Sequence, residues 1–154
     1  METLSTLDKA IRLQKVDLFS DLETDALALA ASIASQIHGP AGTVLVKEKG
    51  STDALYVVLE GRVRLERGER EIASVGPGEG LGTLSLFDDQ PSPATATCAE
   101  ETWLLKIDRE DFYDLLADHS DMTQRMLKAL VKRVRSLLAP RPAVEQPGKG
   151  TPHA

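Results

Sequence analysis

Hydroxyl side chains recur between residues 82 and 97, in a stretch that otherwise lacks the groups needed to hold an anion. From Glu71 to Leu105 the sequence has six acidic residues and no lysine or arginine. A phosphate ligand requires backbone donors and a compensating positive charge, so this stretch is poorly suited to bind one. The hydroxyls could line a pocket for a less charged ligand, but they also suit ordinary strand and loop positions, which we favour. The residues concerned are Thr83, Ser85, Ser92, Thr95 and Thr97.

Arrangements typical of catalysis or metal binding are not evident. His38, His119 and His153 are widely separated, so the sequence predicts no metal site. Neither a Ser/His/Asp set nor a catalytic carboxylate pair is indicated, because Asp88-Asp89 is better explained as a solvated turn. The single cysteine, Cys98, permits no internal disulfide and is expected to be a small buried strand residue. We therefore expect a non-catalytic protein that needs no cofactor.

Length and charge limit the partners. With 154 residues, the chain is expected to form one domain. No apolar run approaches the ~20 residues that a membrane helix requires, and residues 1–8 lack the basic start of a signal peptide, so we expect a cytoplasmic protein without a membrane partner. Residues 1–119 hold 11 Lys and Arg against 22 Asp and Glu, whereas residues 120–138 hold five against one. An acidic body argues against nucleic acid, since phosphate contacts dominate that affinity.

Hydrophobic periodicity divides the chain into four segments. We predict an N-terminal helical segment over residues 1–38, a β-roll over 39–107, two helices over 108–138 and a disordered, proline-rich tail over 139–154. Strand candidates recur about every ten residues between glycine-bearing turns, which is typical of a sandwich or roll. They are Thr43–Val46, Ala54–Leu59, Arg62–Leu65, Glu71–Val75 and Thr102–Ile107.

Four motifs in order resemble the cyclic-nucleotide-binding domain family. Lys49–Val63 is similar to the family's glycine/aspartate turn and buried strand, and Val75–Gly82 resembles its Gly-x-Gly-(Asp/Glu)-x-(Phe/Ile)-Gly approach. The phosphate-binding cassette is matched by Gly82-Thr-Leu-Ser-Leu-Phe-Asp-Asp-Gln-Pro-Ser-Pro-Ala-Thr-Ala96, and the last strand and next helix by Leu104–Phe112. Covering residues 5–138, the resemblance implies an α+β, mainly β fold. It is a jelly-roll-like β-roll flanked by N-terminal helices and two C-terminal helices.

The match is incomplete at the two positions that grip the nucleotide. The family pattern reads roughly Gly-Glu-Leu-(Ala/Gly)-Leu, a spacer, then Pro-Arg-x-Ala-Thr-Val. Thr83 stands where the family has its glutamate, and Ser92 stands where it has its arginine. Losing both charged contacts is expected to cost ~3–5 kcal/mol, so cAMP and cGMP are disfavoured. The resemblance places the pocket, in the cassette-like segment 78–97, at Gly82, Thr83, Leu84, Ser92, Ala94 and Thr95.

A cation from a neighbouring strand could still rescue such a site. The candidates are Arg62, Arg64 and Arg67, which precede the arginine-free stretch. Arg62 and Arg64 alternate with Val63 and Leu65, so we expect those two side chains to face solvent. We therefore favour a cassette without a phosphate-binding cation.

The final helix carries a hydrophobic stripe at the 3-4-3 spacing of a helix-pairing seam. It consists of Leu127, Leu130, Val134 and Leu137. In the family that the chain resembles, the corresponding helix often pairs two subunits, so a homodimer or a protein partner is expected. The alternative is that the stripe packs on the chain's own β-roll or on a neighbouring domain.

The sequence thus leads to two hypotheses about function. The favoured one is a non-catalytic regulatory module with a degenerate pocket, which acts through protein contacts made by its terminal helices. The alternative is a genuine sensor that binds a cyclic nucleotide or another small ligand through backbone donors and hydroxyls. DNA binding is not expected, because a proline-rich tail follows Leu138 where a helix-turn-helix would be needed.

Overall fold

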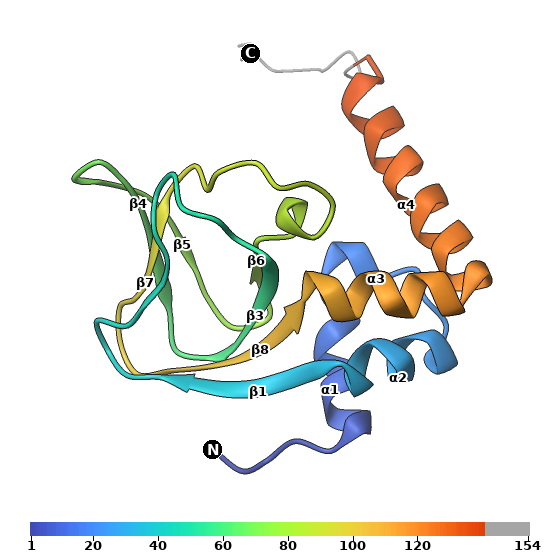
Figure 1. Cartoon of the computed structure of the whole chain (residues 1–154), viewed down its shortest axis with the longest axis horizontal. Helices are drawn as coiled ribbons and strands as arrows, with labels where there is room; N and C mark the ends of the chain where they lie inside the picture. Colours follow the sequence, from blue (N-terminus) through green and yellow to red (C-terminus); the bar gives the residue numbers. More distant parts are fainter. Residues whose placement is uncertain (141–154) are drawn as a thin grey trace, which may run out of the picture.

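Two four-stranded antiparallel sheets pack face to face in the computed structural model, which describes residues 1–140 (Figure 1). The first sheet has the order β1 (Ala34–Gly39), β8 (Thr102–Asp108), β3 (Ala54–Glu60) and β6 (Gly80–Leu81). The second has the order β2 (Val44–Val46), β7 (Thr95–Cys98), β4 (Val63–Arg67) and β5 (Arg70–Val75). Together they form the predicted β-roll, and the α+β, mainly β class is confirmed.

Helices at both ends of the chain gather at one side of this roll (Figure 1). Before the strands come α1 (Thr6–Leu13), the short 3-10 helix η1 (Asp17–Phe19) and α2 (Thr24–Ser32). A second 3-10 turn, η2 (Leu84–Leu86), lies between β6 and β7, and α3 (Arg109–Asp118) and α4 (Ser120–Leu138) follow the roll. Figure 1 shows α4 rising from the end of α3 and standing apart from the two sheets.

All five strands predicted from the sequence are present, with bounds shifted by one or two residues. Turn glycines set where they end. Gly61, between β3 and β4, has φ of +98°, and a Cβ there would lie 2.5 Å from the carbonyl oxygen of Glu101. Only glycine suits that conformation and that spacing.

The predicted N-terminal helical segment, residues 1–38, is wrong at its C-terminal end. α2 stops at Ser32, and residues Ala34–Gly39 form β1, which pairs with β8 from Ala34↔Ile107 to Gly39↔Thr102. Helix propensity is a weak prior that tertiary pairing overrides, and the pairing strand lies some seventy residues away, beyond the reach of local periodicity. The tail predicted over residues 139–154 lies outside the described residues from 141 onward.

The hydrophobic core consists of two clusters on opposite faces of the first sheet. One joins the helices to the sheet and includes Phe19, Leu105 and Phe112. Phe112 makes edge-to-face contacts with Phe19 and with Phe87, which follows η2. The other cluster fills the inside of the roll with side chains from both sheets. Because Phe87 meets Phe112, the cassette packs directly on α3.

Candidate functional site

The cassette begins with a glycine that allows close contact between backbones. Gly82 has φ of +86°, and a Cβ at this position would lie 2.6 Å from the carbonyl oxygen of Ala54, at the start of β3. Thr83 and η2 follow at once, so their position relative to the roll depends on this approach. The Gly82–Leu84 part of the predicted pocket is therefore held against β3.

Hydrogen bonds inside the turn engage the next backbone donors. The N–H groups of Ser85, Leu86 and Phe87 donate to the carbonyl oxygens of Gly82, Thr83 and Leu84, at 3.0, 3.2 and 3.0 Å. These donors thus bond within the cassette itself. A three-residue turn also offers little of the dipole that lets a long helix attract an anion.

Ser92, at the position of the family's arginine, bonds to its own segment. Its Oγ donates to the carbonyl oxygen of Ala94 at 2.6 Å and accepts the N–H of Ala94 at 3.4 Å. Its backbone N–H donates to Gly50, and its carbonyl accepts from the N–H of Lys49. Ser92 and Ala94 are thus brought together, while Thr95 Oγ1 accepts the N–H of Glu48 at 2.9 Å. This limb of the cassette is fastened to the loop before β3.

Arg109, the first residue of α3, is the side chain that sequence reasoning missed. Its Nε donates to the carbonyl oxygen of Ser85 at 2.7 Å. Its Nη2 donates to the carbonyl oxygens of Thr52 at 2.7 Å and Asp88 at 2.8 Å. The guanidinium therefore joins α3, the cassette and the β3 approach. We call this group of contacts the Arg109 clamp.

Each of the three arginines considered as a phosphate-binding cation already contacts a group of the protein. Arg67 does reach the cassette, but its Nε donates to the carbonyl oxygen of Pro93 at 3.2 Å. Arg62 donates to Ser74 Oγ at 2.9 Å, and Arg64 pairs with Glu66 at 3.4 Å. The expectation that Arg62 faces solvent is confirmed, whereas Arg64 is half-buried.

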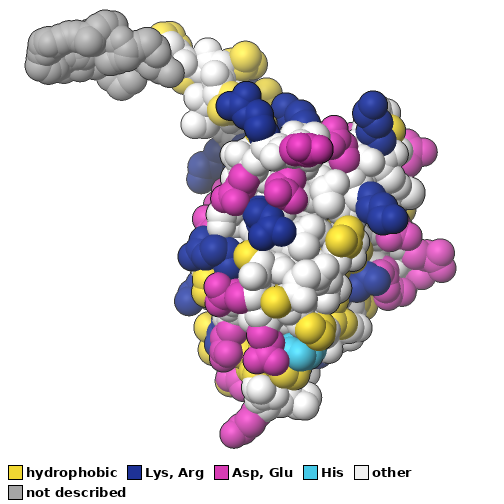
Figure 2. All heavy atoms as spheres, turned by 90° about the vertical axis from the view of Figure 1, so that its left-hand side faces the viewer, with side chains coloured by type: hydrophobic (Ala, Val, Ile, Leu, Met, Phe, Trp, Pro, Cys, Tyr) yellow, Lys and Arg dark blue, Asp and Glu magenta, His cyan; other side chains and the backbone are white. Residues whose placement is uncertain are grey.

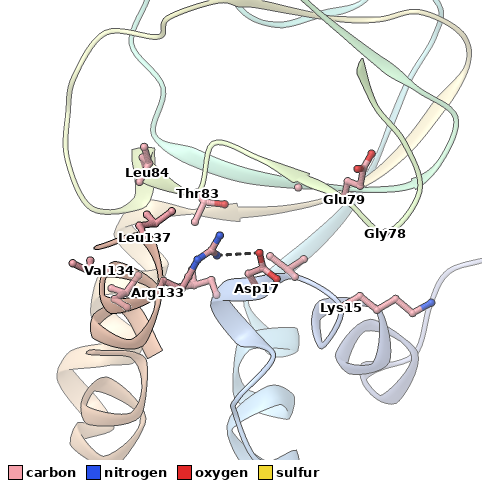
Figure 3. A pocket seen from close by; sticks show the side chains of 13 residues that line it. Lys15, Asp17, Gly78, Glu79, Thr83, Leu84, Arg133, Val134 and Leu137 are labelled. Atoms are coloured by element: carbon pink, nitrogen blue, oxygen red, sulfur yellow. Dashed lines mark ion pairs between the residues drawn. The ribbon is translucent and has the colours of Figure 1, made fainter. Parts of the chain in front are cut away.

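A groove of about 700 Å³ separates the cassette from α4 (Figure 3). Thr83 and Leu84 lie on one side, and Val134 and Leu137 of α4 lie on the other. Its floor includes residues 15–18 and 78–80, and Arg133 crosses to Asp17 with an Nη1–Oδ2 distance of 3.1 Å. Members of two sets predicted separately therefore line one groove: Thr83 and Leu84 of the pocket, and Leu130, Val134 and Leu137 of the α4 stripe. The other predicted residues, Gly82, Ser92, Ala94, Thr95 and Leu127, are not in its lining.

Most of the predicted α4 stripe has no partner within the described residues. Leu127, Val134 and Leu137 are 57%, 53% and 84% exposed. Leu130 is half-buried against the helical core cluster, together with the buried Met122 and Met126. Of the stripe, Leu130 thus comes nearest to the alternative of packing on the chain's own β-roll, since the cluster that it contacts joins the helices to the first sheet.

Cys98 is fully buried, as expected for a strand residue. Burial raises the pKa of its thiol, and a hydrogen bond from the Thr102 side chain opposes that shift. A raised pKa keeps the thiol protonated and unreactive. Within residues 1–140 no cluster of three His, Cys, Asp or Glu side chains could hold a metal ion, and no helix is long and apolar enough to cross a bilayer.

The family model for the cyclic nucleotide-binding domain matches residues 36–119. The chain therefore belongs to the cyclic nucleotide-binding domain family, whose members are regulatory rather than catalytic domains. Its fold agrees with that of the N-terminal domain of a transcriptional regulator from Streptomyces coelicolor A3(2). That match has a TM-score of 0.78 and 34% identity over 82% of this chain and 94% of the other.

Three further comparisons bear on the length and the fold of the chain. The chain is 33% identical to the cyclic AMP receptor protein of Thermus thermophilus over 77% of its own length and 57% of that protein. It likewise spans 57% of the length of a mycobacterial relative. The regulatory subunit of a cAMP-independent protein kinase A from Trypanosoma brucei, at 21% identity, shares the fold alone, with a TM-score of 0.67 over 75% of this chain and 43% of the other. Transcriptional regulators are among these relatives. The relatives therefore do not support the expectation that the protein makes no contact with nucleic acid.

Proposed function

We propose that this regulatory domain does not bind cAMP or cGMP in the manner usual for its family and acts through protein contacts made by α4. The observation that carries the proposal is that polar groups of the cassette already form hydrogen bonds with one another or with neighbouring parts of the domain. The Ser92 hydroxyl forms hydrogen bonds with both the carbonyl oxygen and the N–H group of Ala94. The two arginines that contact the cassette, Arg67 and Arg109, donate to backbone carbonyl oxygens. Both arginines that contact the cassette are therefore already engaged with backbone oxygens.

An incoming cyclic phosphate would have to compete with these bonds. Freeing the Ala94 N–H means breaking its contact with Ser92, and freeing Arg109 means leaving three carbonyl oxygens without their donor. A bond to a charged donor contributes about 1.5–3 kcal/mol, and unsatisfied buried acceptors cost a similar amount. The frame is therefore stable without a ligand, and a phosphate gains little by entering.

Exposed apolar side chains support the second half of the proposal. The last two turns of α4 carry apolar side chains that are more than half exposed, in the same stretch where every residue from 131 to 140 is exposed. Contiguous exposed apolar surface on a regulatory domain is typical of a docking site. A protein partner or a second copy of the chain would bury it.

One observation favours a second candidate, a sensor for a different small ligand. The groove between the cassette and α4 has Thr83 and Arg133 in its lining, and its volume is large enough for a small molecule (Figure 3). A ligand held there would meet hydroxyl and backbone groups as well as the side chain that pairs with Asp17.

Thermal melting with 1 mM cAMP or cGMP tests the proposal. We expect the melting temperature to stay unchanged with either nucleotide. A ligand present at 100 times its Kd stabilises the folded state by about 2.7 kcal/mol, which would raise the melting temperature by several degrees. The non-cyclic nucleotide 5′-AMP serves as the control for general effects of nucleotide and salt.

A rise with cAMP or cGMP that 5′-AMP does not produce would overturn the first half of the proposal and favour the sensor. Repeating the titration with Arg133→Gln then separates two sites. A response lost in this variant places the ligand in the groove, and a response retained places it in the cassette.

A further inference from the structure

α4 presents a second hydrophobic stripe that differs from the one read from the sequence. Leu127, Val131, Val134 and Leu138 follow a 4-3-4 spacing and therefore lie along one face of the helix. Each is more than half exposed. The buried residues Met122, Met126 and Ala129 lie on the opposite side, against the body of the domain. We call the four exposed residues the outer stripe.

Three cations border the outer stripe on a single flank. Lys128, Lys132 and Arg135 each follow a stripe residue by one position, about 100° further round the helix. The remaining cations of α4 are used internally, since Arg125 pairs with Glu23 at 3.0 Å and Arg133 with Asp17 at 3.1 Å. Among the ion pairs within residues 1–140, none involves the three flanking cations.

α4 itself supplies no acid to complement them. Its one acidic residue, Asp121, lies in the first turn, before the stripe begins. A second copy of α4 laid along the stripe would therefore bring only more cations and neutral residues. The stripe spans eleven residue steps, roughly 17 Å, which is short for a stable helix pair without charge complementarity. In Figure 2 the end of α4 projects beyond the body of the domain.

We propose that the outer stripe of α4 docks an amphipathic helix of a partner protein whose apolar face is flanked by aspartate and glutamate. The proposal rests on the proposed function in that it assigns a partner to the protein contacts made by α4. Apolar anchors at i, i+4, i+7 and i+11 give the affinity, and the acidic flank pairs with Lys128, Lys132 and Arg135. The same charges make a second copy of α4 the poorer occupant.

Two fluorescein-labelled peptides test this directly by anisotropy against the full chain. One is residues 120–138 unchanged, and the other carries Lys128→Glu, Lys132→Glu and Arg135→Glu. At about 50 mM salt we expect the acidic peptide to bind at least tenfold more tightly than the unchanged one. The difference should shrink at 0.5 M salt, because charge interactions are then screened over a few ångströms.

Substitutions in the protein separate the stripe from general charge effects. Val134→Glu should abolish binding of the acidic peptide, whereas the matched control Arg70→Glu, on the exposed β4–β5 hairpin, should not change it. A chain with all three flanking cations changed to glutamate should reverse the preference and bind the unchanged peptide.

Three results would overturn the proposal. The first is equal binding of both peptides, and the second is no binding of either. The third is a wild-type chain that is a dimer by light scattering and that Val134→Glu dissociates. That result would make a second copy of the chain the occupant of the outer stripe. None of these measurements involves a nucleotide. A result against the partner helix can therefore be distinguished from a melting experiment that contradicts the proposed lack of cAMP and cGMP binding.

Discussion

Replacing Gly82 by alanine is expected to destabilise the domain by roughly 2–6 kcal/mol, a large part of the 5–15 kcal/mol typical of a folded protein. Two separate effects add. A residue with a Cβ at φ of +86° is strained by about 1–3 kcal/mol. In addition, that Cβ would lie 2.6 Å from the carbonyl oxygen of Ala54, so the cassette or β3 must shift, at a further cost of about 1–3 kcal/mol. Urea denaturation monitored by circular dichroism measures the loss.

Gly68→Ala is the matched control for this prediction. Gly68 also has positive φ, +65°, but a Cβ there meets nothing within 4 Å. It should therefore show the conformational cost alone, about 1–3 kcal/mol. If Gly82→Ala lost no more stability than Gly68→Ala, the close approach between the cassette and β3 would be contradicted.

The second large effect is expected from Arg109→Ala. Removing the clamp takes one charged donor away from three carbonyl oxygens, those of Ser85, Thr52 and Asp88. Because two of these bonds are partly buried, we expect a loss of roughly 2–4 kcal/mol. The loss should be accompanied by faster hydrogen exchange at the amides of residues 85–88. Hydrogen exchange followed by mass spectrometry locates that change.

Arg109→Lys distinguishes the clamp from a simple charge effect. Lysine keeps the positive charge but lacks the planar fork that reaches three acceptors, so it should recover less than half of the lost stability. Exchange in β5, an edge strand of the second sheet, should stay unchanged in both variants. Equal stability of Arg109→Lys and wild type would show that the geometry of the fork is unimportant.

Much of the roll could be predicted because its signals are local. Alternating apolar residues between turn glycines located the strands from Ala54 to Val75, and each of these strands is present. β1 was missed because its six residues become a strand only by pairing with β8, which no local pattern announces. The exposed stripe of α4 differs from the predicted one for a similar reason. Leu130 packs against the domain's own core and is therefore not part of the exposed stripe.

The sequence could predict where the candidate site differs from the family pattern. It could not predict which hydrogen bonds the residues of the site form. Thr83 and Ser92 could be recognised by aligning the cassette with its family pattern. That the Ser92 hydroxyl bonds Ala94 depends on a turn geometry that spacing does not reveal. Arg109 lies just beyond the arginine-free stretch, and its acceptors are 21 to 57 residues away in sequence, so only the folded chain brings them together.

We propose that the cassette keeps the frame of a nucleotide site and lacks its two charged contacts. Calorimetric titration of cAMP into the wild-type chain and into the double variant Thr83→Glu, Ser92→Arg tests it most directly. We expect no measurable binding by the wild-type chain. The two charged contacts, less about 1 kcal/mol for the lost Ser92–Ala94 bonds, should give the double variant an affinity roughly 30- to 1,000-fold higher.

The neutral double variant Thr83→Gln, Ser92→Gln is the matched control, since it adds comparable side-chain length without charge, and it should bind no better than wild type. A charged double variant that gains binding while the neutral one does not is the result we predict. Micromolar binding of cAMP by the wild-type chain, unchanged in the charged double variant, would contradict the account.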